Sequence, residues 1–128
     1  MEIQRHFTGT EWEPKVGYCR ALQAGNMIYL SGTAPVGESG GTFAPGDAYA
    51  QAHRCLEIVQ EALEAMNAGM HQVVRTRMYV TDISRWQEYG KAHQEFFGGH
   101  PPVTTMIEVK ELISPDMLIE IEAEAFVA

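Results

Sequence analysis

The segment DMLIEIEAEAF, residues 116–126, alternates between apolar and acidic side chains and decides the fold class. Successive side chains of a β-strand point to opposite faces of the sheet. One face of the predicted strand carries Met117, Ile119, Ile121, Ala123 and Ala125. The opposite face carries Leu118, Glu120, Glu122, Glu124 and Phe126. The segment therefore predicts a strand that covers a core with one face and presents a row of carboxylates on the other.

Five other segments, all short and bounded by turn residues, are typical of strands: residues 3–7, 19–24, 27–31, 73–80 and 103–109. Residues 47–69 repeat apolar side chains at helical spacing, at Ala52, Leu56, Val59, Leu63 and Met66. Asp47 suits the N-cap of this helix and Gly69 its end. A second helical stripe contains Ile83, Trp86, Tyr89 or Gly90, His93 and Phe97. Asp82 or Ser84 could cap it, and Gly98 and Gly99 should end it.

The predicted order is β-β-β-α-β-α-β-β, an α+β arrangement in which two helices cover one face of a mixed sheet. We expect residues 1–128 to form a single domain, because a chain of 128 residues is long enough for one core. The sequence contains no internal repeat, low-complexity tract or linker. The stretch at residues 32–47 is rich in Gly and Pro and predicts a long surface loop.

The chain is acidic, with a formal net charge of -8. This balance argues against binding to nucleic acid, which needs clustered Lys and Arg. No apolar run approaches the roughly 20 residues that span a bilayer, and the first residues lack the apolar stretch of a signal peptide, so we expect a cytoplasmic protein that does not bind membranes. Cys19 and Cys55 form no CxxC pair, and we interpret them as free thiols, buried or half-buried.

The face of the sheet that carries the glutamates is predicted to be mixed in character. By strand parity Arg75, Arg77 and Tyr79 should share this second face, together with Val73, while Val74, Thr76, Met78 and Val80 point to the helices. On the strand at residues 103–109 we assign Thr104, Met106 and Glu108 to the second face, and Val103, Thr105, Ile107 and Val109 to the helix side. A face that mixes Arg, Glu, Tyr and Met suits a subunit interface with a polar cleft, although a solvated face is the simpler alternative. We therefore predict a closed homo-oligomer.

Several strings in this order resemble the reactive-intermediate deaminase family, the Rid or YjgF-like proteins. They are GYCRALQAGNMIYLSGTAP, QAHRCLEIVQEALEAMNAG, VVRTRMYVTDISRWQEY, EFF ahead of PPVTTMIEV, and LIEIEAEA. The resemblance implies a chorismate-mutase-like fold and a homotrimer whose sheets form a central barrel with three clefts between subunits. It also implies hydrolysis of small enamines or imines, such as 2-aminoacrylate, to a 2-keto acid and ammonia, with no metal or organic cofactor.

The resemblance assigns site residues one at a time. The tyrosine after the first loop matches Tyr18, the SG step matches Ser31 and Gly32, and the carboxylate of the last strand matches Glu120. Glu120 would position and deprotonate the water, Ser31 would hydrogen-bond the ligand, and Tyr18 would cover the cleft. Each residue also has a purely structural interpretation: Glu120 as an ion-pair partner, Ser31 as a turn residue and Tyr18 as an aromatic side chain of a subunit interface.

The chain departs from the family pattern where the substrate carboxylate should bind. The arginine of the family's P-A-R motif is Thr104 here, the cysteine two residues later is Met106, and an asparagine of the second helix is Gly90. An arginine fork grips a carboxylate with two charge-assisted hydrogen bonds, and losing such a contact costs roughly 2–5 kcal/mol. Either the substrate lacks that carboxylate or another cation, with Arg77 as the candidate, replaces the arginine. The alternative is that Arg77 pairs with Glu122 or Glu124 inside the barrel.

Two classes of function remain open. The first is a divergent hydrolytic deaminase of a small imine or enamine, and the second is a trimeric small-molecule binding protein that keeps the cleft without the reaction. A chorismate-mutase-type rearrangement would share only the fold. No metal site is indicated, because His6, His53, His71, His93 and His100 lack ligand spacing, and no phosphate-binding loop is present.

Overall fold

A six-stranded sheet organises the computed structural model, which describes residues 2–128. Its strands are β1 (Ile3–His6), β2 (Ala21–Ala24), β3 (Met27–Thr33), β4 (Val73–Val80), β5 (Val103–Glu108) and β6 (Ile119–Phe126). Their spatial order is β1-β2-β3-β6-β4-β5, and only the β4–β5 pair is parallel. The helices are α1 (Trp12–Val16), α2 (Ala48–Ala65) and α3 (Trp86–Phe97), with 3-10 turns η1 (Met70–Gln72) and η2 (Ile83–Arg85).

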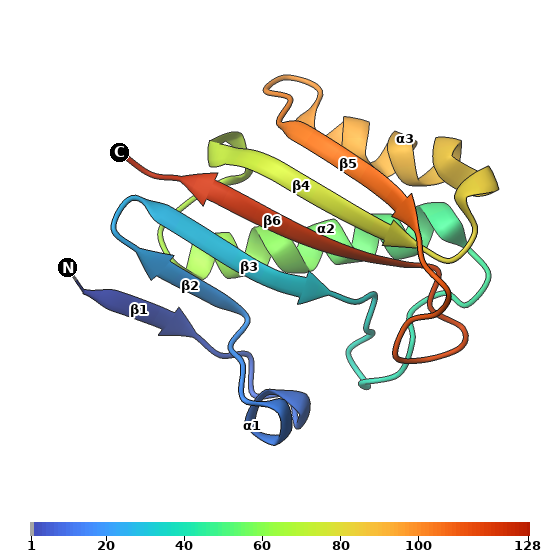
Figure 1. The fold of residues 1–128 in the computed structure, drawn as a ribbon, viewed down its shortest axis with the longest axis horizontal. Helices are drawn as coiled ribbons and strands as arrows, with labels where there is room; N and C mark the ends of the chain where they lie inside the picture. Colours follow the sequence, from blue (N-terminus) through green and yellow to red (C-terminus); the bar gives the residue numbers. More distant parts are fainter. Residues whose placement is uncertain (1) are drawn as a thin grey trace.

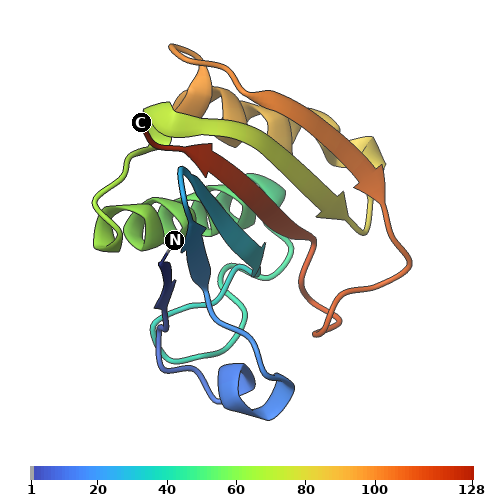
Figure 2. The same cartoon turned by 60° about the vertical axis from the view of Figure 1, so that its left-hand side comes forward.

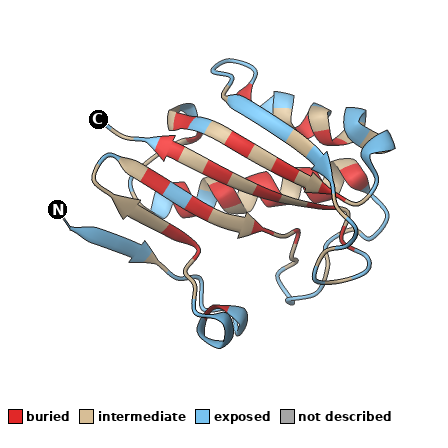
Figure 3. Ribbon diagram, viewed as in Figure 1, coloured by how far each residue is buried: buried red, intermediate tan, exposed pale blue. Residues whose placement is uncertain are grey.

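Helices α2 and α3 lie on the same face of the sheet, and the opposite face carries no helix (Figure 1 and Figure 2). The strands β3, β6 and β4 alternate between buried and more exposed residues, as Figure 3 shows. On β6 the buried set is Ile119, Ile121, Ala123 and Ala125. The predicted α+β architecture and the predicted faces of the last strand are confirmed.

Helix α2 begins where the sequence predicted and ends earlier. The side chain of Asp47 accepts a hydrogen bond from the Ala50 amide at 2.9 Å, as an N-cap does. The helix stops at Ala65, four residues before the predicted stop at Gly69, because Asn67 adopts a left-handed backbone with φ of 60°. Asparagine tolerates this conformation better than most residues.

The stripe predicted for the second helix is only partly buried. Tyr89 and Phe97 are buried in the core, but Ile83 and Trp86 are 40% and 56% exposed. The reason is that η2 precedes the helix: Asp82 caps this 3-10 turn by accepting from the Ser84 amide, so the first turn does not follow α-helical spacing.

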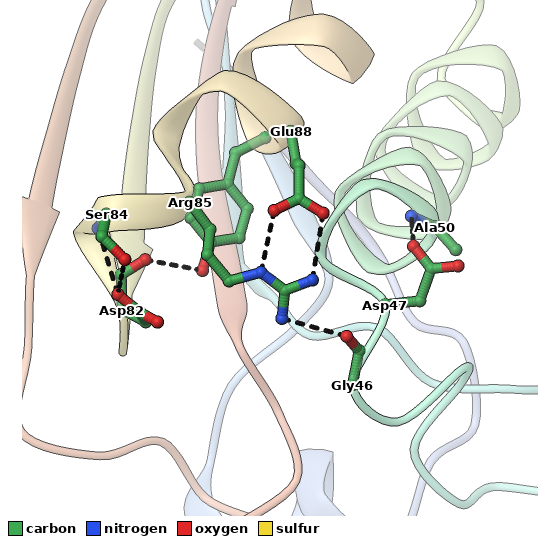
Figure 4. A network of polar contacts seen from close by, with 8 residues as sticks. Gly46, Asp47, Ala50, Asp82, Ser84, Arg85 and Glu88 are labelled. Carbon is green, nitrogen blue, oxygen red and sulfur yellow. Dashed lines mark hydrogen bonds and ion pairs between the residues drawn. The ribbon is translucent and has the colours of Figure 1, made fainter.

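A polar network fixes the start of α3 (Figure 4). The guanidinium of Arg85 donates to both carboxylate oxygens of Glu88, at 2.8 and 3.0 Å, and to the carbonyl of Gly46 at 3.0 Å. The hydroxyl of Tyr89 donates to the carbonyl of Asp82 at 3.0 Å. The network joins the start of α3 to the loop that precedes α2.

The predicted faces of β4 hold for most of the strand. Thr76, Met78 and Val80 are buried against the helices as expected. The first two residues are reversed, since Val73 is buried and Val74 exposed. The β4–β6 register shifts between Val73 and Arg75, and such a bulge exchanges the two faces.

The predicted faces of β5 are wrong. Parallel pairing with β4 places Thr104 beside Thr76 and Met106 beside Met78, both on the helix side, where Met106 packs against the core. Val103 and Ile107 therefore lie on the second face and are 59% and 44% exposed. Apolar residues occur on both sides of this edge strand, so its alternation did not reveal which side faces the helices.

The second face of the sheet carries the predicted ladder of charges. Arg77 lies 3.3 Å from a carboxylate oxygen of Glu124, and Arg75 lies 3.5 Å from the other. The hydroxyl of Tyr79 donates to Glu122 at 2.6 Å, which raises the pKa of the tyrosine. The ladder confirms that these arginines and glutamates share one face.

Candidate functional site

Four of the predicted site residues line one cavity of about 520 Å³. They are Tyr18, Ser31, Gly32 and Glu120. The cavity lies where β3 ends and β6 begins, and residues of α1 and α2 complete its wall. Residues that are distant in the sequence therefore line one cavity within a single chain, whereas the resemblance implied clefts between subunits.

The carboxylate of Glu120 rests against the backbone of Gly32. A Cβ atom at Gly32 would lie 3.0 Å from Cδ of Glu120 and would collide with its Oε2. Glycine is required here because any side chain would push the carboxylate away. Burial raises the pKa of Glu120, while Arg20 opposes this shift and the neighbouring Glu122 adds to it. A carboxyl group with a raised pKa is a stronger base than an exposed one, which suits it to proton transfer.

The hydroxyl hydrogen of Ser31 is already used in a hydrogen bond within the protein. Its hydroxyl donates to the carbonyl of Cys19 at 2.7 Å, and its amide donates to the carbonyl of Arg20 at 3.0 Å. The hydroxyl oxygen retains acceptor capacity, so Ser31 can accept a hydrogen bond from an N–H group of a ligand.

Tyr18 is placed by α1, a five-residue helix that the sequence analysis missed. The buried carboxylate of Glu13 accepts from the amide and hydroxyl of Thr8 and from the amide of Gly9, at 2.7 to 3.2 Å. Burial raises the pKa of Glu13, but these hydrogen bonds and Arg20 outweigh it and lower the pKa. Gly17 ends the helix with φ of 88°, and the chain turns there to bring Tyr18 to the cavity.

Arg20 is a second residue that sequence reasoning missed. It also lines the cavity, and only 8% of its surface is exposed. Its Nη1 donates to Thr33 at 3.2 Å, and its guanidinium lies 5.6 Å from the centre of the Tyr18 ring. Among residues 2–128 its Nε atom has no hydrogen-bond partner. The available signal was an arginine where a strand enters the core, two residues after the family tyrosine.

The remaining predicted site residues lie outside this cavity. Arg77 contacts Glu122 and Glu124 on the second face, as the structural alternative for it proposed. The hydroxyl of Thr104 lies 2.7 Å from that of Thr76, whose oxygen lies 2.8 Å from Nε2 of His93. The expectation that Arg77 and Thr104 share a face is therefore wrong, because their strands place them on opposite sides of the sheet.

A larger and more apolar hollow of about 760 Å³ adjoins the cavity and shares Tyr18 and Ser31 with it. Its acidic residue is Glu13, whose oxygens are occupied by Thr8 and Gly9. Because a group engaged in this way is not free to exchange protons with a ligand, the cavity that contains Glu120 is the better candidate site.

Within residues 2–128 no cluster of three His, Cys, Asp or Glu side chains is arranged to hold a metal ion. In the same part of the chain, no helix combines the length and the apolar composition needed to cross a membrane. Cys55 is buried and Cys19 half-buried, both as free thiols, and burial raises the pKa of Cys55.

Known proteins similar to this chain cover nearly its whole length. Residues 8–127 match the family model described as endoribonuclease L-PSP. A RutC family protein of Pyrococcus horikoshii is 31% identical over 120 residues, which cover 94% of each chain. A RutC family protein of Pyrococcus abyssi is 33% identical over 119 residues, covering 91% of this chain and 93% of that protein.

Solved structures show the same similarity. A member of the YjgF/YER057c/UK114 family from Mycobacterium tuberculosis superposes with a TM-score of 0.89 at 42% identity, covering 98% of this chain and all (100%) of that one. The YjgF protein of E. coli gives a TM-score of 0.78 at 33% identity, covering 85% and 87% of the two chains. The chain therefore belongs to the Rid/YjgF family, whose family model bears the description endoribonuclease L-PSP.

Proposed function

We propose that this protein hydrolyses a small enamine or imine to a carbonyl compound and ammonia. The observation that carries the proposal is the carboxylate of Glu120, largely withdrawn from water and held against Gly32 in a cavity that also contains Ser31 and Tyr18. A carboxylate whose pKa is raised by burial is a stronger base than an exposed one and can take a proton from water.

The reaction needs few groups. An enamine first takes a proton at its carbon atom and loses one from its nitrogen, which gives the imine. Glu120 then removes a proton from water while the oxygen attacks the imine carbon, and the imine nitrogen takes a proton from solvent, which gives the carbinolamine. Glu120 passes its proton to that nitrogen, the C–N bond breaks and ammonia leaves, while the hydroxyl group loses its proton to solvent and becomes the carbonyl. The sum is imine plus water giving carbonyl compound plus ammonia. Ser31 accepts a hydrogen bond from the imine N–H, which orients the carbon toward the water.

We also propose that the protein works as a homotrimer whose second sheet faces form the interior. The uncovered face combines the ladder of arginines and glutamates with exposed apolar side chains, namely Tyr29, Val103, Ile107 and Phe126. Exposed apolar groups of this extent are typical of surfaces that another subunit covers. The cavity would then lie close to a subunit junction, and the β5 edge with Thr104 and Met106 would approach it from a neighbour.

A binding protein without catalysis is the second candidate. The observation that favours it is Thr104, which stands where the family's deaminases hold the substrate with arginine and which is engaged with Thr76. RNA, which the family description names, is disfavoured as a substrate because the net charge of -8 repels phosphates.

The test uses imines generated in place by an amino-acid oxidase, with release of 2-keto acid and ammonia followed against a buffer blank. The deaminase proposal predicts acceleration by the wild-type protein and its loss in Glu120→Gln, which keeps the shape of the side chain and removes the base. No acceleration by the wild type over a broad set of amino acids would leave the binding protein as the better reading.

A further inference from the structure

We propose that Arg20 is the cation that binds an anionic group of the substrate, in the role that the family's missing arginine leaves open at Thr104. The assignment of the substrate as an imino acid rests on the proposed function. The anion site itself does not, since it is a property of the cavity that Arg20 shares with Glu120.

The first support is that Arg20 lacks the ion pair that the half-buried arginines of the chain have. Four of them have a carboxylate oxygen at 3.6 Å or less, namely Arg54, Arg75, Arg77 and Arg85. Arg20 is buried more deeply than any of these four, yet it forms no ion pair with another of residues 2–128. Glu13 and Glu120 act on this charge only through space, and a buried charge without a direct ion-pair partner is costly, so an anion that enters the cavity gains energy by pairing with it.

The second support is the set of donors that remain on the guanidinium. A guanidinium carries five N–H donors, and the contact of Nη1 with Thr33 is the hydrogen bond that its side chain makes within residues 2–128. The Tyr18 ring lies over the group and Thr33 fixes one end, so the fork is held in place before a ligand arrives. A fixed fork is well suited to a carboxylate, which it can bind through two hydrogen bonds.

The two carboxylates whose pKa Arg20 lowers, those of Glu13 and Glu120, are in contact with other groups. Glu13 is saturated by the hydrogen bonds of Thr8 and Gly9. Glu120 rests against Gly32; burial raises its pKa, and Arg20 opposes this shift through space. The cavity therefore places a cation and a base side by side in one chain, and a 2-imino acid could present its carboxylate to Arg20 and its imine carbon to Glu120.

The competing explanation is that Arg20 serves only to keep Glu120 ionised. The two explanations differ in what they predict for an uncharged ligand. If Arg20 only tunes Glu120, a neutral ligand and its anionic counterpart bind equally well. If Arg20 binds the anion, the charge of the ligand decides the affinity.

The experiment measures binding of pyruvate and of its neutral amide, pyruvamide, by isothermal titration. Wild-type protein should prefer pyruvate, and Arg20→Gln should weaken pyruvate binding by about 10- to 150-fold while leaving pyruvamide unchanged. Arg20→Lys should retain part of the preference. Arg85→Gln is the matched control, because it removes an arginine remote from the cavity and should preserve pyruvate affinity. Thermal melting checks that each variant is folded.

Failure of this inference is distinguishable from failure of the proposed function. Equal binding of the two ligands by the wild type, absence of pyruvate binding, or an unchanged preference in folded Arg20→Gln overturns the role of Arg20. An Arg20-dependent preference in a protein that accelerates no imine hydrolysis supports the anion site and removes the deaminase proposal. Imine hydrolysis by Arg20→Gln with an unchanged KM for imino acids keeps the deaminase and overturns Arg20.

Discussion

Alanine in place of Gly32 tests the contact on which the geometry of Glu120 depends. The added Cβ would lie 3.0 Å from Cδ of Glu120 and 3.4 Å from its Cγ, and would overlap its Oε2. Carbon atoms in ordinary contact are about 3.5–4.0 Å apart, so Cδ must retreat by about 0.5–1.0 Å, the difference from 3.0 Å. The carboxylate oxygens would move at least as far.

The effect on catalysis should exceed the effect on stability. A misplacement of about 1 Å in a catalytic group costs on the order of 100-fold in rate, which corresponds to about 2.7 kcal/mol in the barrier. The carboxylate end of Glu120 is flexible, so the strain should stay near the low end of overpacking, about 1 kcal/mol. For a chain of this size the melting temperature should fall by roughly 3–5 °C.

The assay compares kcat/KM for imine hydrolysis and the melting temperature in Gly32→Ala and in a control, Gly41→Ala. A Cβ at Gly41 meets no atom within 4 Å, so this control should behave like the wild type. Gly32→Ala in a Glu120→Ala background should lower the melting temperature little, because the colliding group is gone. Wild-type activity in Gly32→Ala would refute the claim that Glu120 acts from its position against Gly32.

Three further predictions follow from the site and the fold. Burial raises the pKa of Glu120, and a general base must be ionised, so kcat/KM should rise with pH through an apparent pKa above 4.5 in a pH–rate profile. Arg20→Gln removes the charge that opposes this shift and should move the apparent pKa higher. A kcat/KM that stays constant across that pH range would contradict the role of Glu120. Gln51→Ala should lower the free energy of urea unfolding by about 2–5 kcal/mol, because the buried side-chain amide accepts from the Leu118 amide at 2.7 Å and donates to the Asp116 carbonyl at 3.0 Å; a loss below about 1 kcal/mol would show that these bonds do not hold the segment that precedes β6. Ile107→Lys places a charge on the uncovered face and should convert the proposed trimer to smaller species in light scattering, whereas a wild-type mass would contradict that interface.

The fold was predictable where one physical constraint governs the sequence. The strict alternation of β6 and the capping Asp47 of α2 follow from one-sided burial and from the unsatisfied amides of a helix start. The faces of β5 could not be read in the same way, because this edge strand carries apolar side chains on both sides. Its register with β4, which pairs Thr104 with Thr76, is a long-range property that no local pattern records.

The grouping of candidate residues was predictable where the family pattern is retained and not where it changes. Tyr18, Ser31, Gly32 and Glu120, which the resemblance assigned to a site, line one cavity, and their roles stay a prediction. Arg20 was not predicted as a site residue, because it is distinguished by its burial and by donors that have no partner among residues 2–128. Neither property can be seen in the sequence. The five-residue α1 is too short to show a helical period, so the support that Glu13 gives to this region was also hidden.

The most direct measurement of the central claim is a crystal structure of the protein soaked with pyruvate at a concentration that saturates binding in solution. The cavity should contain the ligand, with its carboxylate against the guanidinium of Arg20 and its keto carbon facing the carboxylate of Glu120, beside Tyr18 and Ser31. Pyruvate bound at another place on the protein, or an empty cavity at that concentration, would contradict the assignment of this cavity as the site of recognition and reaction.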